Sequence, residues 1–188
     1  MTWAKGRETI EDQLRRGHLE RVPANEAEAH HLMAKATAHL ATAATVTGTD
    51  PEIAYDALYA AARKALASLL IQQGLRPTRS GGHEVAIEAA HAQLVPPLGD
   101  VLRPLRHIKR RRNDGDYAGS ERQIHEEDIH ADLPATTAIV DAAARILPQL
   151  TVFVPSRRPG PTASRRWRRL GHHRRDSPPT SPPELFFA

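Results

Sequence analysis

Apolar residues recur along most of the chain at intervals of three and four positions, the spacing of one face of an α-helix. Over residues 51–73 they occupy more than one side, which is typical of a helix buried in the middle of a bundle. No segment shows the strict alternation of a half-buried strand. The pattern predicts helices over residues 7–16, 26–46, 51–73, 83–94, 98–112 and 126–146.

Glycine, proline and capping residues set the expected ends of these helices. Asp50 precedes Pro51, an arrangement that favours a helix start, because aspartate caps and proline fits the first turn. The glycine-rich segment 74–82 predicts a loop. The run Asn113-Asp114-Gly115-Asp116 is expected to end the helix over 98–112. Pro134 should kink or divide the last helix.

The composition agrees with a helical fold. Hydrophobic residues make up 40% of the 188 residues but aromatic residues only 4%, so alanine and leucine supply most of the apolar surface. These two residues favour helices, whereas strands favour β-branched and aromatic side chains. We therefore expect an all-α bundle of about five to six helices. The absence of cysteine excludes disulfides and thiolate metal sites.

The charge is unevenly distributed and divides the chain in two. Residues 155–188 hold eight arginines against Asp176 and Glu184, a net charge of +6, so residues 1–154 carry −2 of the total of +4. We predict that 1–154 form the helical domain and that 155–188 are a disordered basic tail, because they lack apolar periodicity. Translation of a GC-rich gene in a shifted reading frame would also produce this abrupt change of composition at residue 155. Arginines around Trp167 also suit single-stranded nucleic acid.

The sequence predicts a soluble, cytoplasmic protein without membrane contact. The amino-terminal segment mixes charges of both signs and lacks the apolar core of a signal peptide. No run of residues approaches the ~20 apolar positions that a membrane span needs.

Candidate chemistry gathers in the segment 98–112. Helical spacing turns Arg106 and Arg110 toward solvent, together with Arg103 and near Lys109, and puts Arg112 on the buried side. One interpretation is that Arg112 lines a groove and binds a phosphate while the outer cations attract a polyanion. The other is that the helix has ended, Arg112 pairs with a carboxylate such as Asp56 or Asp116, and the outer arginines are only solvated.

Two further groups of side chains leave alternatives open. Tyr55, Tyr59 and Arg63 follow at i, i+4 and i+8, which predicts either a polar cleft wall or core tyrosines with satisfied hydroxyl groups. Arg76 and His83 have six residues between them across the loop, and His83 is typical of the first turn of a helix. The His125–Asp128 spacing is too loose for a metal site, so we expect no metal.

A family resemblance adds to this interpretation. The segments Ala54-Tyr55-Asp56-Ala57 and Ala62-Arg63-Lys64-Ala65 resemble the central helix of HEPN (higher eukaryote and prokaryote nucleotide-binding) domains. The loop from Gly74 and the later Arg112-Asn113-Asp114-Gly115-Asp116-Tyr117 are similar to one bacterial HEPN subfamily. The resemblance covers about residues 10–150.

The resemblance implies a HEPN-like bundle that forms a homodimer and needs no cofactor. Many HEPN domains are metal-independent ribonucleases of toxin–antitoxin and defence systems, in which an arginine and a histidine activate the ribose 2′-OH. Here Tyr117 stands where the histidine is expected, and a phenol is a poor base near neutral pH. The chain is therefore expected to bind RNA or nucleotide, through Arg112 and Tyr117 with Arg63, Arg106, Lys109, Arg110, Asn113 and Asp116.

Two alternatives remain open. The chain is a ribonuclease if Tyr117 or a nearby histidine replaces the missing base. It is an interaction module if, as in some HEPN proteins, it pairs with a nucleotidyltransferase that modifies a tyrosine, for which Tyr117 is the candidate.

Overall fold

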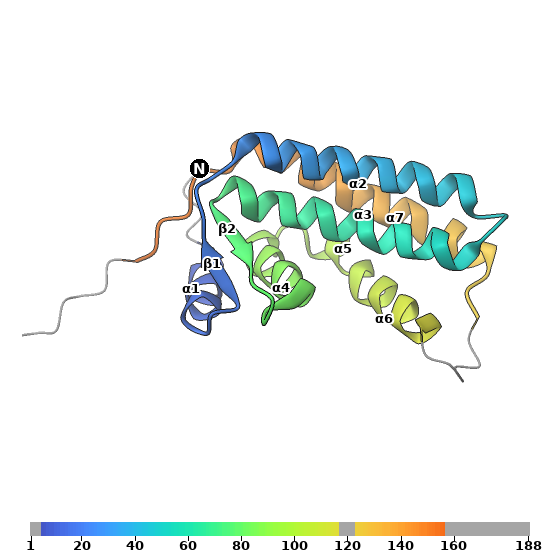
Figure 1. The fold of residues 1–188 in the computed structure, drawn as a ribbon, viewed down its shortest axis with the longest axis horizontal. Coiled ribbons are helices and arrows are strands. Elements are labelled where there is room, and N and C mark those ends of the chain that lie inside the picture. The colour runs from blue at the N-terminus through green and yellow to red at the C-terminus, as the bar shows by residue number, and fades with distance from the viewer. Residues whose placement is uncertain (1–4, 117–122, 157–188) are drawn as a thin grey trace, which may run out of the picture. The chain divides into compact units, whose positions relative to one another are not determined.

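The structure is a computed structural model that describes residues 5–116 and 123–156. Three long helices form its centre: α2 (Glu26–Val46), α3 (Pro51–Gln72) and α7 (Glu126–Ile146). Figure 1 shows them side by side, with α3 between the others and the second layer of helices. The fold of the described residues is thus the expected all-α bundle.

Local sequence signals start the two first long helices where predicted. The side chain of Asn25 accepts a hydrogen bond from the backbone N–H of Glu28 at the start of α2, at 2.9 Å. Asp50 caps α3 in the same way, accepting from the N–H of Ile53 at 3.0 Å, with Pro51 in the first turn. Both side chains satisfy donors that the helix itself leaves unpaired.

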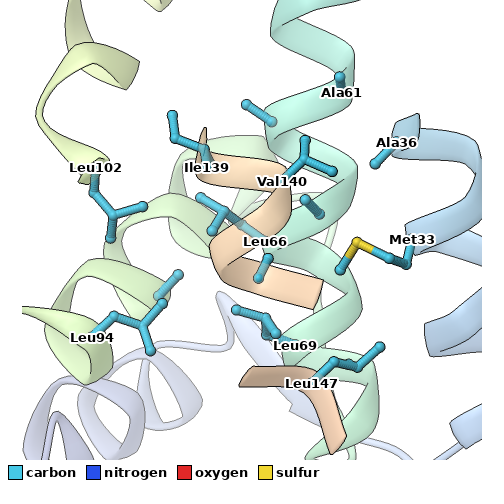
Figure 2. Packing of buried hydrophobic residues seen from close by; sticks show 14 of the residues in the cluster. Met33, Ala36, Ala61, Leu66, Leu69, Leu94, Leu102, Ile139, Val140 and Leu147 are labelled. Atoms are coloured by element: carbon cyan, nitrogen blue, oxygen red, sulfur yellow. The ribbon is translucent and has the colours of Figure 1, made fainter. Parts of the chain in front are cut away.

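The core lies where α3 meets its neighbours. Leu66 and Leu69 of α3 pack against Met33 of α2 and against Ile139 and Val140 of α7 (Figure 2). Alanine on the facing sides of α2 and α3 allows these helices to approach closely, and α3 is buried along most of its length. The composition rich in alanine and leucine is explained by this central helix, which must pack on more than one side.

A second layer covers the other side of α3. It consists of α4 (Gly82–Leu94), the short α5 (Gly99–Leu102) and α6 (Pro104–Asp116). Leu94, Leu102 and Leu105 from this layer point toward Leu66 and complete the core. This arrangement places α6 alongside both α3 and α7.

A short sheet corrects the prediction of a plain loop over 74–82. β1 (Leu19–Arg21), which follows α1 (Arg7–Arg15), pairs antiparallel with β2 (Leu75–Pro77). Three-residue strands are too short to show an alternating pattern, so the sequence gives no strand signal. Gly81 packs against the backbone of His18, just before β1. A Cβ at position 81 would lie 2.2 Å from the carbonyl oxygen of His18, so only glycine fits.

The segment 98–112 was predicted to be one helix, but it forms two. Pro104 begins α6, because proline lacks the N–H that would continue α5 and suits a first turn. The predicted end at Asn113 is also wrong, since α6 continues to Asp116. Asparagine, aspartate and glycine disfavour a helix by at most about 1 kcal/mol each, which the packing of α6 on α3 and α7 overrides.

Pro134 does not divide the last helix. α7 runs through it from Glu126 to Ile146 and then continues as the 3₁₀ turn η1 (Leu147–Gln149). The proline ring is exposed, and so is His130, whose carbonyl loses its helical partner. Water can satisfy that carbonyl, while Ile139 and Val140 hold the buried side.

The structure bears on two further expectations. Of the tail 155–188, all but Pro155 and Ser156 lie outside the described residues, so its disorder stays a prediction. Within the described segments, no helix combines the length and the apolar character that crossing a membrane requires.

Candidate functional site

A cleft of about 750 Å³ opens between α4 on one side and α5 and α6 on the other. Its apolar surface comes from Leu66 of α3, Ile87 of α4, and Leu102 and Leu105 of the opposite wall. The volume falls in the range of small-molecule sites, which combine an apolar surface with a few polar groups.

The two walls carry opposite charges. Arg106, Lys109, Arg110 and Asn113 of α6 line one wall, together with Arg103 just before it. Their spacing of three and four residues places them along one side of α6. The other wall is the face of α4 that presents Glu84, Glu88 and His91. Four of the predicted binding residues therefore meet in one cleft.

Not all of these charges are available to a ligand. Lys109 forms an ion pair with Glu84 across the cleft, and Arg103 pairs with Asp100. Glu88 accepts a hydrogen bond from Nε2 of Gln13 at 2.7 Å. Within residues 5–116 and 123–156, no carboxylate forms an ion pair with Arg106 or Arg110.

Arg106 and Arg110 are both exposed, as the sequence predicts. They are the guanidinium groups of this wall that a bound anion can reach without breaking an ion pair of the described residues.

Arg112 does not line the cleft. Its Nε lies 2.8 Å from Oδ1 of Asp56 on α3, and its side chain is 32% exposed. This is the pairing that the second sequence interpretation predicts, although α6 has not ended at this point. The side chain of Asp116 and the whole of Tyr117 lie outside the described residues, so their predicted roles stay predictions.

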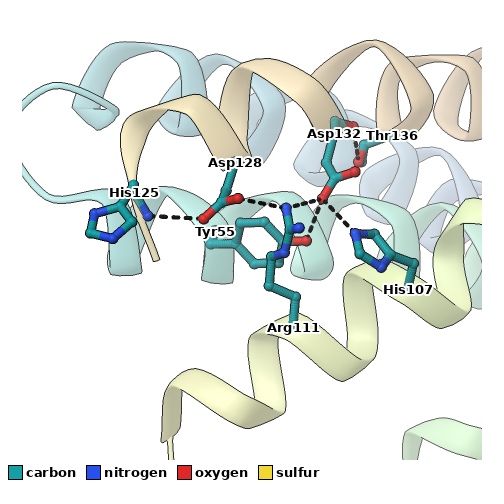
Figure 3. Close-up of polar contacts among 7 residues, drawn as sticks. All are labelled: Tyr55, His107, Arg111, His125, Asp128, Asp132 and Thr136. Carbon is teal, nitrogen blue, oxygen red and sulfur yellow. Dashed lines mark hydrogen bonds and ion pairs between the residues drawn. The ribbon is translucent and has the colours of Figure 1, made fainter. Parts of the chain in front are cut away.

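Arg111, which the sequence did not single out, reaches from α6 to two carboxylates of α7 (Figure 3). It is 19% exposed, and its Nη1 lies 2.8 Å from Oδ1 of Asp128 and 3.4 Å from Oδ2 of Asp132. Tyr55 donates its hydroxyl proton to Oδ2 of Asp132 at 2.5 Å. Asp128 and Asp132 stand at i and i+4 on α7, beside the buried Ile129. Two carboxylates on the buried side of a helix need a cation, so this spacing could have indicated a buried arginine.

This network is structural. It connects α3, α6 and α7, and Tyr55 is fully buried, as the interpretation of core tyrosines with satisfied hydroxyls predicts. Burial and the hydrogen bond to Asp132 raise the pKa of Tyr55 far above its ordinary value, so the phenol stays a neutral donor. Asp128 also accepts from the N–H of His125 and so caps α7.

The arginine of α3, Arg63, meets the start of α4. Nη1 of Arg63 lies 3.1 Å from Nδ1 of His83. Because a guanidinium has only donors, Nδ1 accepts and the other ring nitrogen, Nε2, carries the proton. Burial, followed by Arg63, Lys64 and Arg112, lowers the pKa of His83. The arginine that bonds to His83 is thus Arg63, whereas Arg76 pairs with Glu20 across the sheet.

Comparison with known proteins adds no relative: no family model, no curated protein and no solved structure matches this chain.

Proposed function

We propose that this chain is a HEPN-like protein that binds RNA or nucleotide in the cleft between α4 and α6. The proposal rests on Arg106 and Arg110, two exposed guanidinium groups on one wall that no carboxylate of the described residues neutralises. A guanidinium binds a phosphate through two parallel hydrogen bonds, which makes this spacing suited to phosphate groups.

The rest of the cleft supports a ligand that is more than a phosphate. Leu66, Ile87 and Leu105 give it an apolar surface, against which a nucleobase can pack. Asn113 supplies an amide that can bond to the polar edge of a base or to a ribose hydroxyl. An inorganic anion would leave these groups without a role.

The Arg63–His83 contact favours binding over cleavage by this pair. The Nδ1 atom of His83 is occupied by Arg63, and its Nε2 carries a proton. In this state it donates a hydrogen bond rather than accepting the proton of a ribose hydroxyl. The resemblance to HEPN domains supports the same ligand class and a homodimer acting in a toxin–antitoxin or defence system.

Fluorescence anisotropy with a labelled single-stranded oligoribonucleotide tests the proposal. The double variant Arg106→Ala/Arg110→Ala should bind at least about tenfold more weakly, since a hydrogen bond to a charged group contributes about 1.5 kcal/mol and 1.4 kcal/mol is tenfold. Arg145→Ala is the matched control, because Arg145 is an exposed arginine on α7 that does not line the cleft. Equal affinities for the double variant and the parent would exclude the cleft as the binding site.

A further inference from the structure

Basic side chains also gather outside the cleft, where α2, α3 and the start of α4 meet. Lys35 and His39 stand at i and i+4 on α2, next to Arg63 and Lys64 of α3 and His83 of α4. We call these five residues the basic surface. Its components come from three elements, so it was not visible as a charge run in the sequence.

The packing around these cations places them close together. Ala36, which follows Lys35, lies in the same core cluster as Ala62 and Ala65, which flank Arg63 and Lys64. Nη1 of Arg63 lies 3.1 Å from Nδ1 of His83. Burial and then Lys64, Arg63 and Lys35 lower the pKa of His39. The pKa of Lys64 is likewise lowered by burial and then by Arg63 and Lys35. Like charges that lie together repel, and each such contact costs stability unless an anion is present.

The described part of the chain provides no such anion. Across residues 5–116 and 123–156, no carboxylate forms an ion pair with Lys35, Arg63 or Lys64. Elsewhere carboxylates do accompany basic side chains: Arg76 has Glu20, Arg111 has Asp128 and Asp132, and Arg112 has Asp56. The lysines and the arginine of the basic surface therefore share with Arg106 and Arg110 the lack of a carboxylate partner among the described residues.

The basic surface begins where the cleft ends. Glu84, which lines the cleft and pairs with Lys109, directly follows His83. The Nδ1 atom of His83 in turn lies 3.1 Å from Nη1 of Arg63 on α3. Basic side chains therefore continue from α6 through the start of α4 to α3, against which α2 packs.

We propose that the cleft and the basic surface together form one track for a single-stranded polynucleotide, which enters the cleft with one nucleotide and lies with its following phosphates over α3 and α2. This inference rests on the proposed function and specifies its ligand: a chain with several phosphates rather than a mononucleotide. Proteins that bind single strands combine such a basic path with surfaces for individual bases. A single phosphate would satisfy Arg106 and Arg110 and leave Lys35 and Lys64 uncompensated.

The test compares ligands of different length. Affinities are measured for a nucleoside monophosphate, a dinucleotide and a longer oligoribonucleotide, using the parent, Arg106→Ala/Arg110→Ala and Lys35→Ala/Lys64→Ala. We expect affinity to rise with length in the parent. Removing Lys35 and Lys64 should weaken only the longer ligand and reduce its slope of log affinity against log salt by about 1.4, since each neutralised phosphate of a single strand contributes about 0.7.

The outcomes separate the two proposals. If Arg106→Ala/Arg110→Ala weakens every ligand while Lys35→Ala/Lys64→Ala leaves the slope for the longer one unchanged, the track is wrong and the cleft stands. If neither variant changes any affinity, both proposals fail. Arg16→Ala/Arg145→Ala is the charge-matched control, since both arginines are exposed and neither belongs to the cleft or the basic surface. Should Lys64→Ala disturb the fold, Lys35→Glu, at an exposed position, must produce the loss of affinity by itself.

Discussion

Arg111 and Arg112 are neighbours on α6 with very different surroundings. Arg111 contacts two carboxylates of α7 that are only 26% and 12% exposed, whereas Arg112 contacts Asp56, which is 48% exposed. Removing one partner of a buried pair leaves an uncompensated charge, but an exposed pair contributes little because water screens it. The two residues thus have different importance for stability.

The first prediction follows from this difference. Arg111→Ala should lower the free energy of unfolding by about 3 kcal/mol, and Arg112→Ala by less than about 1 kcal/mol, as measured by urea denaturation. The two variants are matched in chemistry and in helix position, so each serves as the control of the other. Equal losses would mean that Arg111 is not the cation that holds α6 against α7.

The sequence interpretation that paired Arg112 with Asp56 is confirmed, but the sequence did not indicate that Arg111 contacts α7. Arg111 and Arg112 lie three and four residues after the buried Ile108, one on each side of the buried stripe. Which of them meets carboxylates depends on α7 and α3, which are distant in the sequence. For the same reason the outward direction of Arg106 and Arg110 was predictable, whereas their place in a cleft was not, because α4 supplies the opposite wall.

At the scale of elements, helix bounds follow the sequence where local signals act alone. α2 and α7 have the predicted ends, and α3 differs by one residue. Two bounds were predicted wrongly. Pro104, a local signal, splits the helix over 98–112, and packing on α3 and α7 lets α6 continue through Gly115. The pairing of β1 with β2 joins segments on either side of α2 and α3, so no local pattern announces it.

The second prediction concerns the two prolines of α6 and α7. Pro134→Ala should raise the free energy of unfolding by roughly 1–2 kcal/mol, because the interior proline costs about 3 kcal/mol in a helix while part of the gain is lost to a more flexible unfolded chain. Because the proline ring is exposed, the substitution removes no buried packing contacts. Differential scanning calorimetry measures the change.

Pro104→Ala is the control for that experiment. Pro104 is the first residue of α6, where its missing N–H would be unpaired in any case. We expect this variant to be neutral or slightly destabilised. If both substitutions stabilised the protein alike, the position of Pro134 within α7 would not be the cause.

At the scale of the whole molecule, the distribution of the cations shows why net charge is a poor guide to the ligand of this chain. Residues 1–154 carry a formal charge of −2, yet their cations gather along the cleft and the basic surface. Other basic side chains have carboxylate partners, as Arg76 has Glu20 and Arg111 has Asp128. An anionic ligand responds to the local field rather than to the sum, so an acidic domain remains compatible with binding RNA.

The histidines of the basic surface should make binding depend on pH. Burial and neighbouring cations hold the pKa of His39 and of His83 below the ordinary value, so both imidazoles are neutral near pH 7. The charged groups that face them are Lys35, Arg63 and Lys64, with Arg112 near His83. As the pH falls below about 6.5, the ordinary pKa of histidine, protonation adds positive charge while RNA phosphates stay ionised. Affinity for the oligoribonucleotide should therefore increase toward acidic pH.

In His39→Gln/His83→Gln this increase should be lost, while affinity at pH 7.5 changes little because the parent imidazoles are uncharged there. His30→Gln/His31→Gln is the matched control, since both residues are exposed on α2 and neither belongs to the basic surface. Anisotropy titrations at stepped pH and constant ionic strength measure the effect. An increase that persists in His39→Gln/His83→Gln would assign the pH dependence to other groups and place the bound strand away from α2 and the start of α4.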